Sequence, residues 1–271
     1  FDQRVKVLHQ DNRGQASARN LGLEWMYKNS NSHWITFVDS DDWIHPEMLE
    51  ILYKAAVEYE SKISICGYRE TQGENIKVYK SQKKGRLLKT EEFYCNCGDL
   101  RNVIPWGKLY HRDCFKYVRF PEIRACEDEF VTYKILFEFS EIPVVEAPLY
   151  AYFMSANSTM RSPWNYDKFM AIRAFEEQIQ HFKNRKFQTA LETRIKMYLW
   201  GIESQPKEVK KEKEISYKYE RMLLKKLKIF LIKRRKQYPF KENITRYEEA
   251  FPVIMRIYWY IQGIKYKLKR K

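Results

Sequence analysis

The chain has 271 residues, of which 44% are hydrophobic and 16% aromatic, and it carries a formal net charge of +15. This composition is ample for the core of one large domain with an appendage. No run of about 18 apolar residues occurs, which excludes a membrane-spanning helix. The five cysteines form no disulfide framework of a secreted domain, which favours a reducing cytoplasm.

The positive charge lies in the carboxyl-terminal part of the chain. Residues 1–164 contain 22 Lys and Arg against 23 Asp and Glu, whereas residues 165–271 contain 28 against 12. A neutral body with a basic tail indicates a polyanionic partner surface.

Strand and helix patterns alternate from the amino terminus. We predict a strand over residues 3–9, a helix over 15–29, a strand over 34–39, a helix over 46–60 and a strand over 62–68. Strands that alternate with helices favour the α/β class, with a mostly parallel sheet flanked by helices.

The remainder of the chain becomes increasingly helical. We predict a loop or hairpin over the lysine-rich residues 72–90, helices over 90–97 and 127–139, and a strand pair or one bent strand over 142–154. Helices are then expected over residues 164–183, 187–203, 209–236 and 244–270. The expected organisation is an α/β domain over residues 1–160 and a basic helical region over 161–271.

Three carboxylates follow the apolar run in "WITFVDSDDW", residues 34–43. The run suits a central parallel strand buried on both faces, and ligands of α/β sheets bind at the carboxyl ends of such strands. Asp39 and Asp41 flank one residue, so in extended backbone both can point the same way. Two close carboxylates repel each other unless a cation lies between them, and hard divalent cations prefer oxygen ligands. The alternative is that these residues, with Asp42, only form a turn.

The segment "DNRGQASARNLGL", residues 11–23, predicts a loop that enters a helix closely packed on the sheet. Gly14 ends the loop, and small side chains follow it. Arg19 falls in the first turns of the helix, where free backbone N–H groups favour a phosphate that the guanidinium could clamp. The alternative is a tightly packed helix with an Arg on its surface.

A third acidic cluster, "CEDEF", opens the helix predicted over 127–139. Glu127, Asp128 and Glu129 could simply complement the positive end of the helix dipole. The functional alternative is a general base, because a carboxylate beside an alcohol can take its proton during attack.

Five blocks, in this order and spacing, resemble the bacterial family 2 glycosyltransferases of the GT-A fold: "NRGQASARNLGL", "ITFVDSDD", "WGKLYHRDCF", "FPEIRACEDEFVTYKIL" and "PLYAYFMSANSTM". Members of this family are inverting enzymes that use nucleotide-diphosphate sugars. The resemblance spans roughly residues 3–160. The family's amino-terminal nucleotide-binding segment would precede Phe1, so we expect this chain to lack it.

The resemblance implies a donor site. Asp39 and Asp41 match the D-x-D motif, in which the first Asp contacts the nucleotide and the last binds Mn²⁺ or Mg²⁺ bridging the diphosphate. Arg19 falls where the family holds the donor diphosphate and sugar, and the donor expected is a UDP sugar.

The resemblance also implies an acceptor site. Asp128 matches the family's base, which deprotonates the acceptor hydroxyl, while Glu127 would orient the acceptor and Trp106 would line its pocket. The acceptor expected is a glycan or a lipid-linked sugar in the synthesis of a bacterial surface polysaccharide.

The basic carboxyl-terminal region combines lysines with aliphatic and aromatic residues, as in residues 209–236. Such helices can lie on an anionic membrane, which would make the protein cytoplasmic and peripheral on the inner face of the cell membrane. The alternative is a helical pack against the body with solvated lysines. No nucleic-acid-reading module accompanies the charge, so no nucleic acid is expected. A second functional hypothesis is a catalytically silent fragment that acts as a basic membrane- or partner-binding module.

Overall fold

The computed structural model describes residues 2–72, 84–96, 98–154 and 170–209. The chain divides into two compact units, Phe1–Tyr219 and Glu220–Lys271, and all described residues belong to the first. In this described part no helix has the length and apolar character needed to cross a bilayer.

Several expectations concern residues outside the described ranges. The division expected after residue 160 falls there and stays a prediction. The helices expected over 209–236 and 244–270 also lie there, as does most of the lysine-rich segment 72–90.

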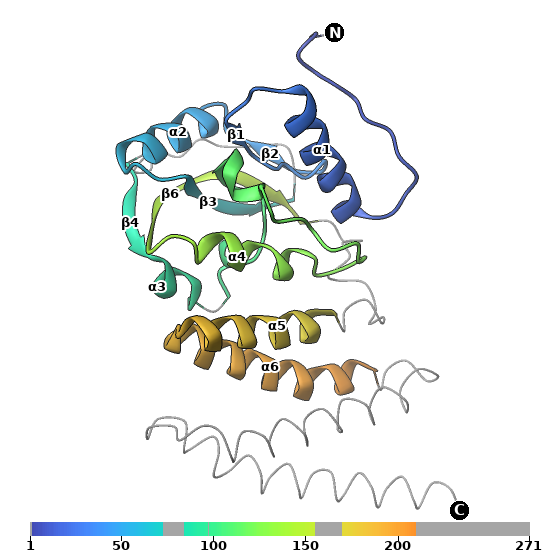
Figure 1. Ribbon diagram of the computed structural model, residues 1–271, viewed down its shortest axis with the longest axis vertical. Helices are drawn as coiled ribbons and strands as arrows, with labels where there is room; N and C mark the ends of the chain where they lie inside the picture. Colours follow the sequence, from blue (N-terminus) through green and yellow to red (C-terminus); the bar gives the residue numbers. More distant parts are fainter. Residues whose placement is uncertain (1, 73–83, 97, 155–169, 210–271) are drawn as a thin grey trace, which may run out of the picture. The chain divides into compact units, whose positions relative to one another are not determined.

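One sheet forms the centre of the first unit (Figure 1). Its strands are β1 (Trp34–Ile35), β2 (Trp43–Ile44), β3 (Ile63–Thr71), β4 (Arg86–Lys89), β5 (Lys108–His111) and β6 (Glu141–Phe153). Their order is β1-β5-β3-β6-β2, and β4 also pairs with β6. The segment expected as a strand pair or one bent strand is therefore the single strand β6.

The sheet is mixed rather than mostly parallel, which corrects the prediction. Within the described residues β3 and β6 pair in parallel, whereas the pairs β1–β5, β3–β5, β2–β6 and β4–β6 are antiparallel. β1 is also short and lies at one end of the strand order, so it is not a central parallel strand. Alternation of strands and helices along a sequence indicates the α/β class, which is confirmed, but pairing direction depends on contacts between distant segments.

The two helices predicted in the amino-terminal half are present. α1 spans Gln15–Asn29 as predicted, and Gly14 precedes it with a φ of 86°, a left-handed conformation that favours glycine. α2 spans Met48–Glu58 and buries Met48 and Leu52 against the sheet.

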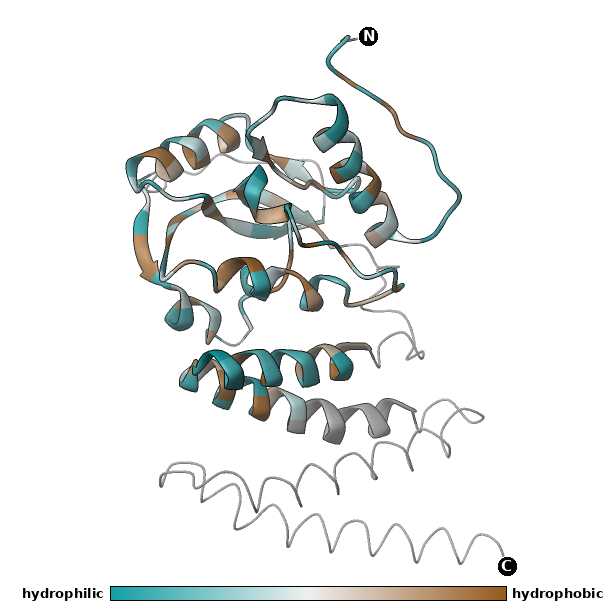
Figure 2. Cartoon of the chain, in the orientation of Figure 1, coloured by the Kyte–Doolittle hydropathy of each residue, from teal (hydrophilic) through white to brown (hydrophobic). Residues whose placement is uncertain are grey.

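The strand predicted over residues 3–9 does not form. This segment leads into α1 as an extended stretch, and Figure 2 shows hydrophobic residues along it. Val5 and Val7 are 60% and 67% exposed. An alternating apolar pattern becomes a strand only where a neighbouring strand accepts its hydrogen bonds, and no strand of the described sheet pairs with it.

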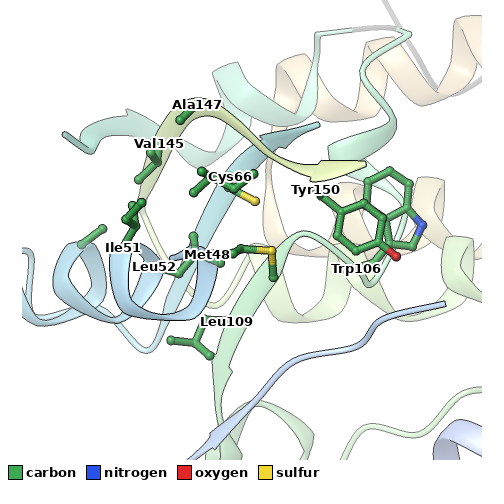
Figure 3. Packing of buried hydrophobic residues seen from close by; sticks show 11 residues of the cluster. Met48, Ile51, Leu52, Cys66, Trp106, Leu109, Val145, Ala147 and Tyr150 are labelled. Carbon is green, nitrogen blue, oxygen red and sulfur yellow. The ribbon is translucent and has the colours of Figure 1, made fainter. Parts of the chain in front are cut away.

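The main hydrophobic core lies between α2 and the sheet (Figure 3). Its buried members include Met48, Leu52 and Val145, and at one end the rings of Trp106 and Tyr150 stack with centroids 4.2 Å apart. The chain could not place a side chain at Gly67, because a Cβ there would lie 2.6 Å from the carbonyl oxygen of Glu146. The register between β3 and β6 shifts at this close approach.

A second group of apolar side chains joins the later helices to the body. α3 (Thr90–Tyr94), α4 (Thr132–Leu136), α5 (Met170–Arg185) and α6 (Gln188–Val209) surround it. Phe182 of α5 lies 5.4 Å from the Tyr94 ring and 4.7 Å from the Phe137 ring, measured between centroids. The helix predicted over 127–139 is shorter than expected, since a 3-10 turn at Asp128–Phe130 precedes α4.

Candidate active site

Arg19 belongs to one of the three motifs that the sequence singles out, and it binds a residue of each of the other two. Its Nη1 donates to Oε1 of Glu127 at 2.6 Å, and its Nη2 donates to Oδ1 of Asp39 at 2.9 Å. The Arg19 side chain is only 10% exposed, and the guanidinium lies over the Phe120 ring at 5.4 Å. A buried guanidinium between two carboxylates fixes the start of α1, the end of the β1 segment and the 127–130 turn relative to one another.

The loop after β1 is held by a carboxylate that the sequence analysis left without a role. Asp42 accepts hydrogen bonds from the Tyr150 hydroxyl at 2.6 Å and from the Phe153 backbone N–H at 2.8 Å. The Tyr150 oxygen accepts the backbone N–H of Asp39 at 3.1 Å. Burial raises the pKa of Asp42, although these hydrogen bonds act in the opposite direction. Asp42 therefore positions the loop, and its oxygens are already engaged.

Asp41 contrasts with its neighbour. Its side chain is exposed, and among the described residues it makes no hydrogen bond or ion pair. No set of three or more His, Cys, Asp or Glu side chains in the described ranges is arranged to hold a metal ion. The oxygen donors nevertheless fit Mg²⁺ or Mn²⁺ bound together with a substrate, because Mg²⁺ is commonly held by one or two carboxylates plus phosphate oxygens. Asp41 is the carboxylate that this arrangement leaves free.

Asp128 lies in a tight turn whose backbone is strained. Cys126, two residues earlier, has a φ of 62°, which is unusual for a residue with a side chain. The backbone N–H of Glu129 donates to Oδ1 of Asp128 at 2.9 Å. Burial, with the nearby charges of Glu127 and Glu129, raises the pKa of Asp128 to about 8, while Arg19 acts in the opposite direction. A carboxylate with this pKa can accept a proton near neutral pH.

Glu127 is buried, and its two oxygens differ. Oε1 accepts the hydrogen bond from Arg19, whereas Oε2 is buried with no hydrogen-bond partner in the described structure. A buried acceptor without a donor is costly, so a hydroxyl group arriving at this atom would relieve that cost.

Trp106 lies in the hydrophobic core. It is 3% exposed and packs against Tyr68, Tyr150 and Tyr152. Through Tyr150 it supports the loop that carries Asp39 and Asp42. Its expected contact with the acceptor stays a prediction.

The structure thus brings Arg19, Asp39, Glu127 and Asp128 together, and it adds Asp42 and Tyr150. The sequence contained a signal for both additions. Asp42 belongs to the same acidic run as Asp39 and Asp41, and Tyr150 lies in the block "PLYAYF". Their pairing could not be read from the sequence, because they are 108 positions apart.

The sequence is similar to those of known glycosyltransferases. Residues 1–119 match the family described as "Glycosyl transferase family 2". Glycosyltransferase GlyA of Streptococcus pneumoniae is 28% identical over 224 residues, covering 75% of this chain and 30% of GlyA. Glycosyltransferase GlyG of the same organism is 30% identical over 176 residues, covering 60% of this chain and 57% of GlyG. The chain therefore spans about a third of the length of GlyA and little more than half of the length of GlyG.

Among solved structures, S. aureus TarS in complex with UDP-GlcNAc superposes with a TM-score of 0.54 at 19% identity, covering 69% of this chain and 54% of that chain. This likeness agrees with the GT-A-like fold expected from the sequence. Over residues 1–119, the chain is thus similar to glycosyltransferase family 2.

Proposed function

We propose that the protein transfers a sugar from a nucleotide-diphosphate donor to a hydroxyl acceptor, with inversion at the anomeric carbon and with the help of a divalent cation. The observation that carries this proposal is the Arg19 clamp, which joins Asp39 on the donor side to Glu127 beside Asp128. The proposal is supported by the Arg19 guanidinium between two carboxylates, by the exposed Asp41 carboxylate and by the raised pKa of Asp128.

On the donor side, Asp41 would hold Mn²⁺ or Mg²⁺, with Asp39 towards the nucleotide and Arg19 towards the diphosphate. When bound, the cation neutralises the charge that develops on the leaving diphosphate. The Arg19 guanidinium is already paired with Asp39 and Glu127, and such an acidic site favours binding of a diphosphate together with a cation rather than alone. TarS binds UDP-GlcNAc, which makes a UDP sugar the donor to test first.

On the acceptor side, Asp128 takes the proton of the attacking hydroxyl. The hydroxyl oxygen forms a bond to the anomeric carbon on the face opposite the diphosphate, the bond from that carbon to the diphosphate oxygen breaks, and the nucleoside diphosphate leaves. The unpartnered Oε2 of Glu127 supports a role in orienting the acceptor, because it can accept a hydrogen bond from a sugar hydroxyl.

The wider assignments rest on the family resemblance and on the charge of the chain. The acceptor would be a glycan or a lipid-linked sugar of a surface polysaccharide. The basic carboxyl-terminal region, with 28 Lys and Arg against 12 Asp and Glu over residues 165–271, would rest on an anionic membrane from the cytoplasmic side.

The test uses the full-length protein. Calorimetry with UDP-GlcNAc, UDP-glucose and UDP-galactose should detect binding that requires Mn²⁺ and is reversed by EDTA. Incubation of the bound donor with a glycolipid extract should give a product whose anomeric configuration, read by NMR, is opposite to that of the donor. Absence of cation-dependent binding for every donor, or retention of configuration, would refute the proposal.

A further inference from the structure

A chain of buried hydrogen bonds connects α6 to the turn that carries Asp128. Nε of Arg194 donates to the Tyr94 hydroxyl at 2.8 Å, and that hydroxyl donates to Oε1 of Gln178 at 3.0 Å. Nε2 of Gln178 donates to the backbone oxygen of Glu129 at 2.5 Å and to its Oε2 at 2.9 Å. We call Arg194, Tyr94 and Gln178 the relay.

The relay has a single direction. The Tyr94 hydroxyl has one proton, which it gives to Gln178, so it can only accept from Arg194. The Gln178 oxygen is thereby engaged, which leaves its NH₂ group for Glu129. Each relay side chain is at most 2% exposed, and burial raises the pKa of Tyr94, which keeps its hydroxyl protonated. Buried polar groups of this kind are costly unless all are paired, so the chain fixes one arrangement.

The turn that receives the relay needs support from outside. Its backbone holds the positive φ of Cys126, and Asp128 lies between two further carboxylates. On one side Arg19 binds Glu127. On the other side Gln178 binds Glu129, with Nη1 of Arg194 at 3.8 Å from the same Glu129 oxygen. Asp128 is therefore held between two clamps, one from α1 and one from the relay.

We propose that Arg194, Tyr94 and Gln178 are positioning residues for Asp128, so that the α5–α6 pair is part of the catalytic unit. The inference rests on the proposed function, in which Asp128 accepts the acceptor proton. The expected consequence is that damage to the relay lowers the rate of transfer without changing donor affinity, because Asp39, Asp41 and Arg19 hold the donor.

The charges around Asp128 predict a second consequence. Glu127 and Glu129 favour its protonated form, Arg19 favours its charged form, and Cys126 and the buried Lys108 also lie within electrostatic reach. Replacing Arg194 by Met removes the cation beside Glu129 and leaves that carboxylate less compensated. The pKa of Asp128 should then rise, and the acidic limb of the pH–rate profile should move to higher pH.

Two buried tyrosines offer a matched pair for the test. Tyr94→Phe removes the hydroxyl at the centre of the relay. Tyr198→Phe removes a hydroxyl that donates to Oε1 of Glu176 at 2.9 Å, between α6 and α5. In the full-length protein both variants should lose similar thermal stability. Only Tyr94→Phe should lose kcat, by about tenfold to a hundredfold, the range expected for a misplaced catalytic group.

Arg194→Lys keeps a positive charge and one donor, so it should recover part of the kcat that Arg194→Met loses. If Tyr94→Phe does not fold, the comparison of Arg194→Met with Arg194→Lys tests the relay in its place. Equal kcat in Tyr94→Phe and Tyr198→Phe, with wild-type turnover normal, would overturn the inference while leaving the proposed function intact.

If the wild type shows no transfer, the proposed function fails, and NMR of ¹³C-carboxyl-labelled aspartate still decides the inference. A higher Asp128 pKa in Arg194→Met than in Tyr198→Phe would support coupling through the relay. Identical values in the two variants would overturn it.

Discussion

The two acidic segments of the site contain the same kinds of residue in opposite surroundings. In the 39–42 loop, Asp41 is exposed and unpaired among the described residues, and Asp39 keeps a side chain 31% exposed. In the 126–130 turn, Glu127 is buried and Asp128 has a pKa of about 8. The first group is open to water, whereas burial makes Asp128 in the second reluctant to lose its proton.

This difference in burial suits the two segments to different chemical roles. An exposed carboxylate suits the binding of a cation and its phosphates. A carboxylate that gains and loses a proton near neutral pH suits proton transfer. The predictions below separate these two roles, beginning with the largest expected effect.

The first prediction concerns the turn. Asp128→Asn preserves size but cannot accept the proton, so transfer should fall by a factor of about 10² to 10⁴. Donor affinity should barely change, because the proposed function assigns donor binding to Arg19 and the 39–42 loop. Transfer rate and donor binding are measured on the same full-length protein. The exposed Glu122→Gln, in the same segment, is the control. Near-normal transfer in Asp128→Asn would show that the acids at 127–129 only complement the helix that follows.

The second prediction concerns the loop. Asp41→Ala removes the proposed cation ligand, so Mn²⁺-dependent affinity for the UDP sugar should fall by at least about tenfold to a hundredfold. Binding without Mn²⁺ should be unchanged. Calorimetry with and without Mn²⁺ makes the comparison, with the exposed Glu24→Ala in α1 as control. An unchanged effect of Mn²⁺ in Asp41→Ala would remove Asp41 from the site.

The third and smallest effect is on stability. The pKa of Asp128 is about 8 in the folded protein, and the ordinary value of 3.8 applies to the unfolded chain. Between these pH values the folded chain holds a proton that the unfolded chain has lost, so folding stability falls as pH rises. Asp128→Asn lacks this loss. Relative to wild type it should therefore gain stability from pH 5 to pH 9, seen as a rise in relative Tm of at least a few °C.

Melting curves of wild type and Asp128→Asn at the two pH values test this linkage. Glu122→Gln should follow the wild type at both. A gap between Asp128→Asn and wild type that stays constant with pH would mean that Asp128 is an ordinary surface acid, and the contrast between the two segments would then be lost.

Much of the fold could be predicted because its signals are local. The periodic apolar residues and Gly14 placed α1 at the observed residues, and α2 was placed within two residues of each end. The acidic run after the apolar segment also indicated a site, and Arg19 does meet Asp39. These features depend on neighbours a few positions away.

The features that were missed depend on distant partners. Residues 3–9 have a strand pattern without a strand beside them, and the direction of pairing in the sheet comes from segments far apart in sequence. The relay could not be predicted from the sequence for a related reason. Gln178 and Arg194 look like surface residues of amphipathic helices, and only packing against Tyr94 and Glu129 buries them.

Both ties that assemble the site, Arg19 to Glu127 and Asp42 to Tyr150, join residues 108 positions apart. During synthesis, the acidic loop therefore leaves the ribosome long before the strand that will hold it. Contacts of such long sequence separation are among the slow steps of folding, because a large loop must close before they form. The site is thus a late product of folding, and an incomplete chain carries its carboxylates without their arrangement.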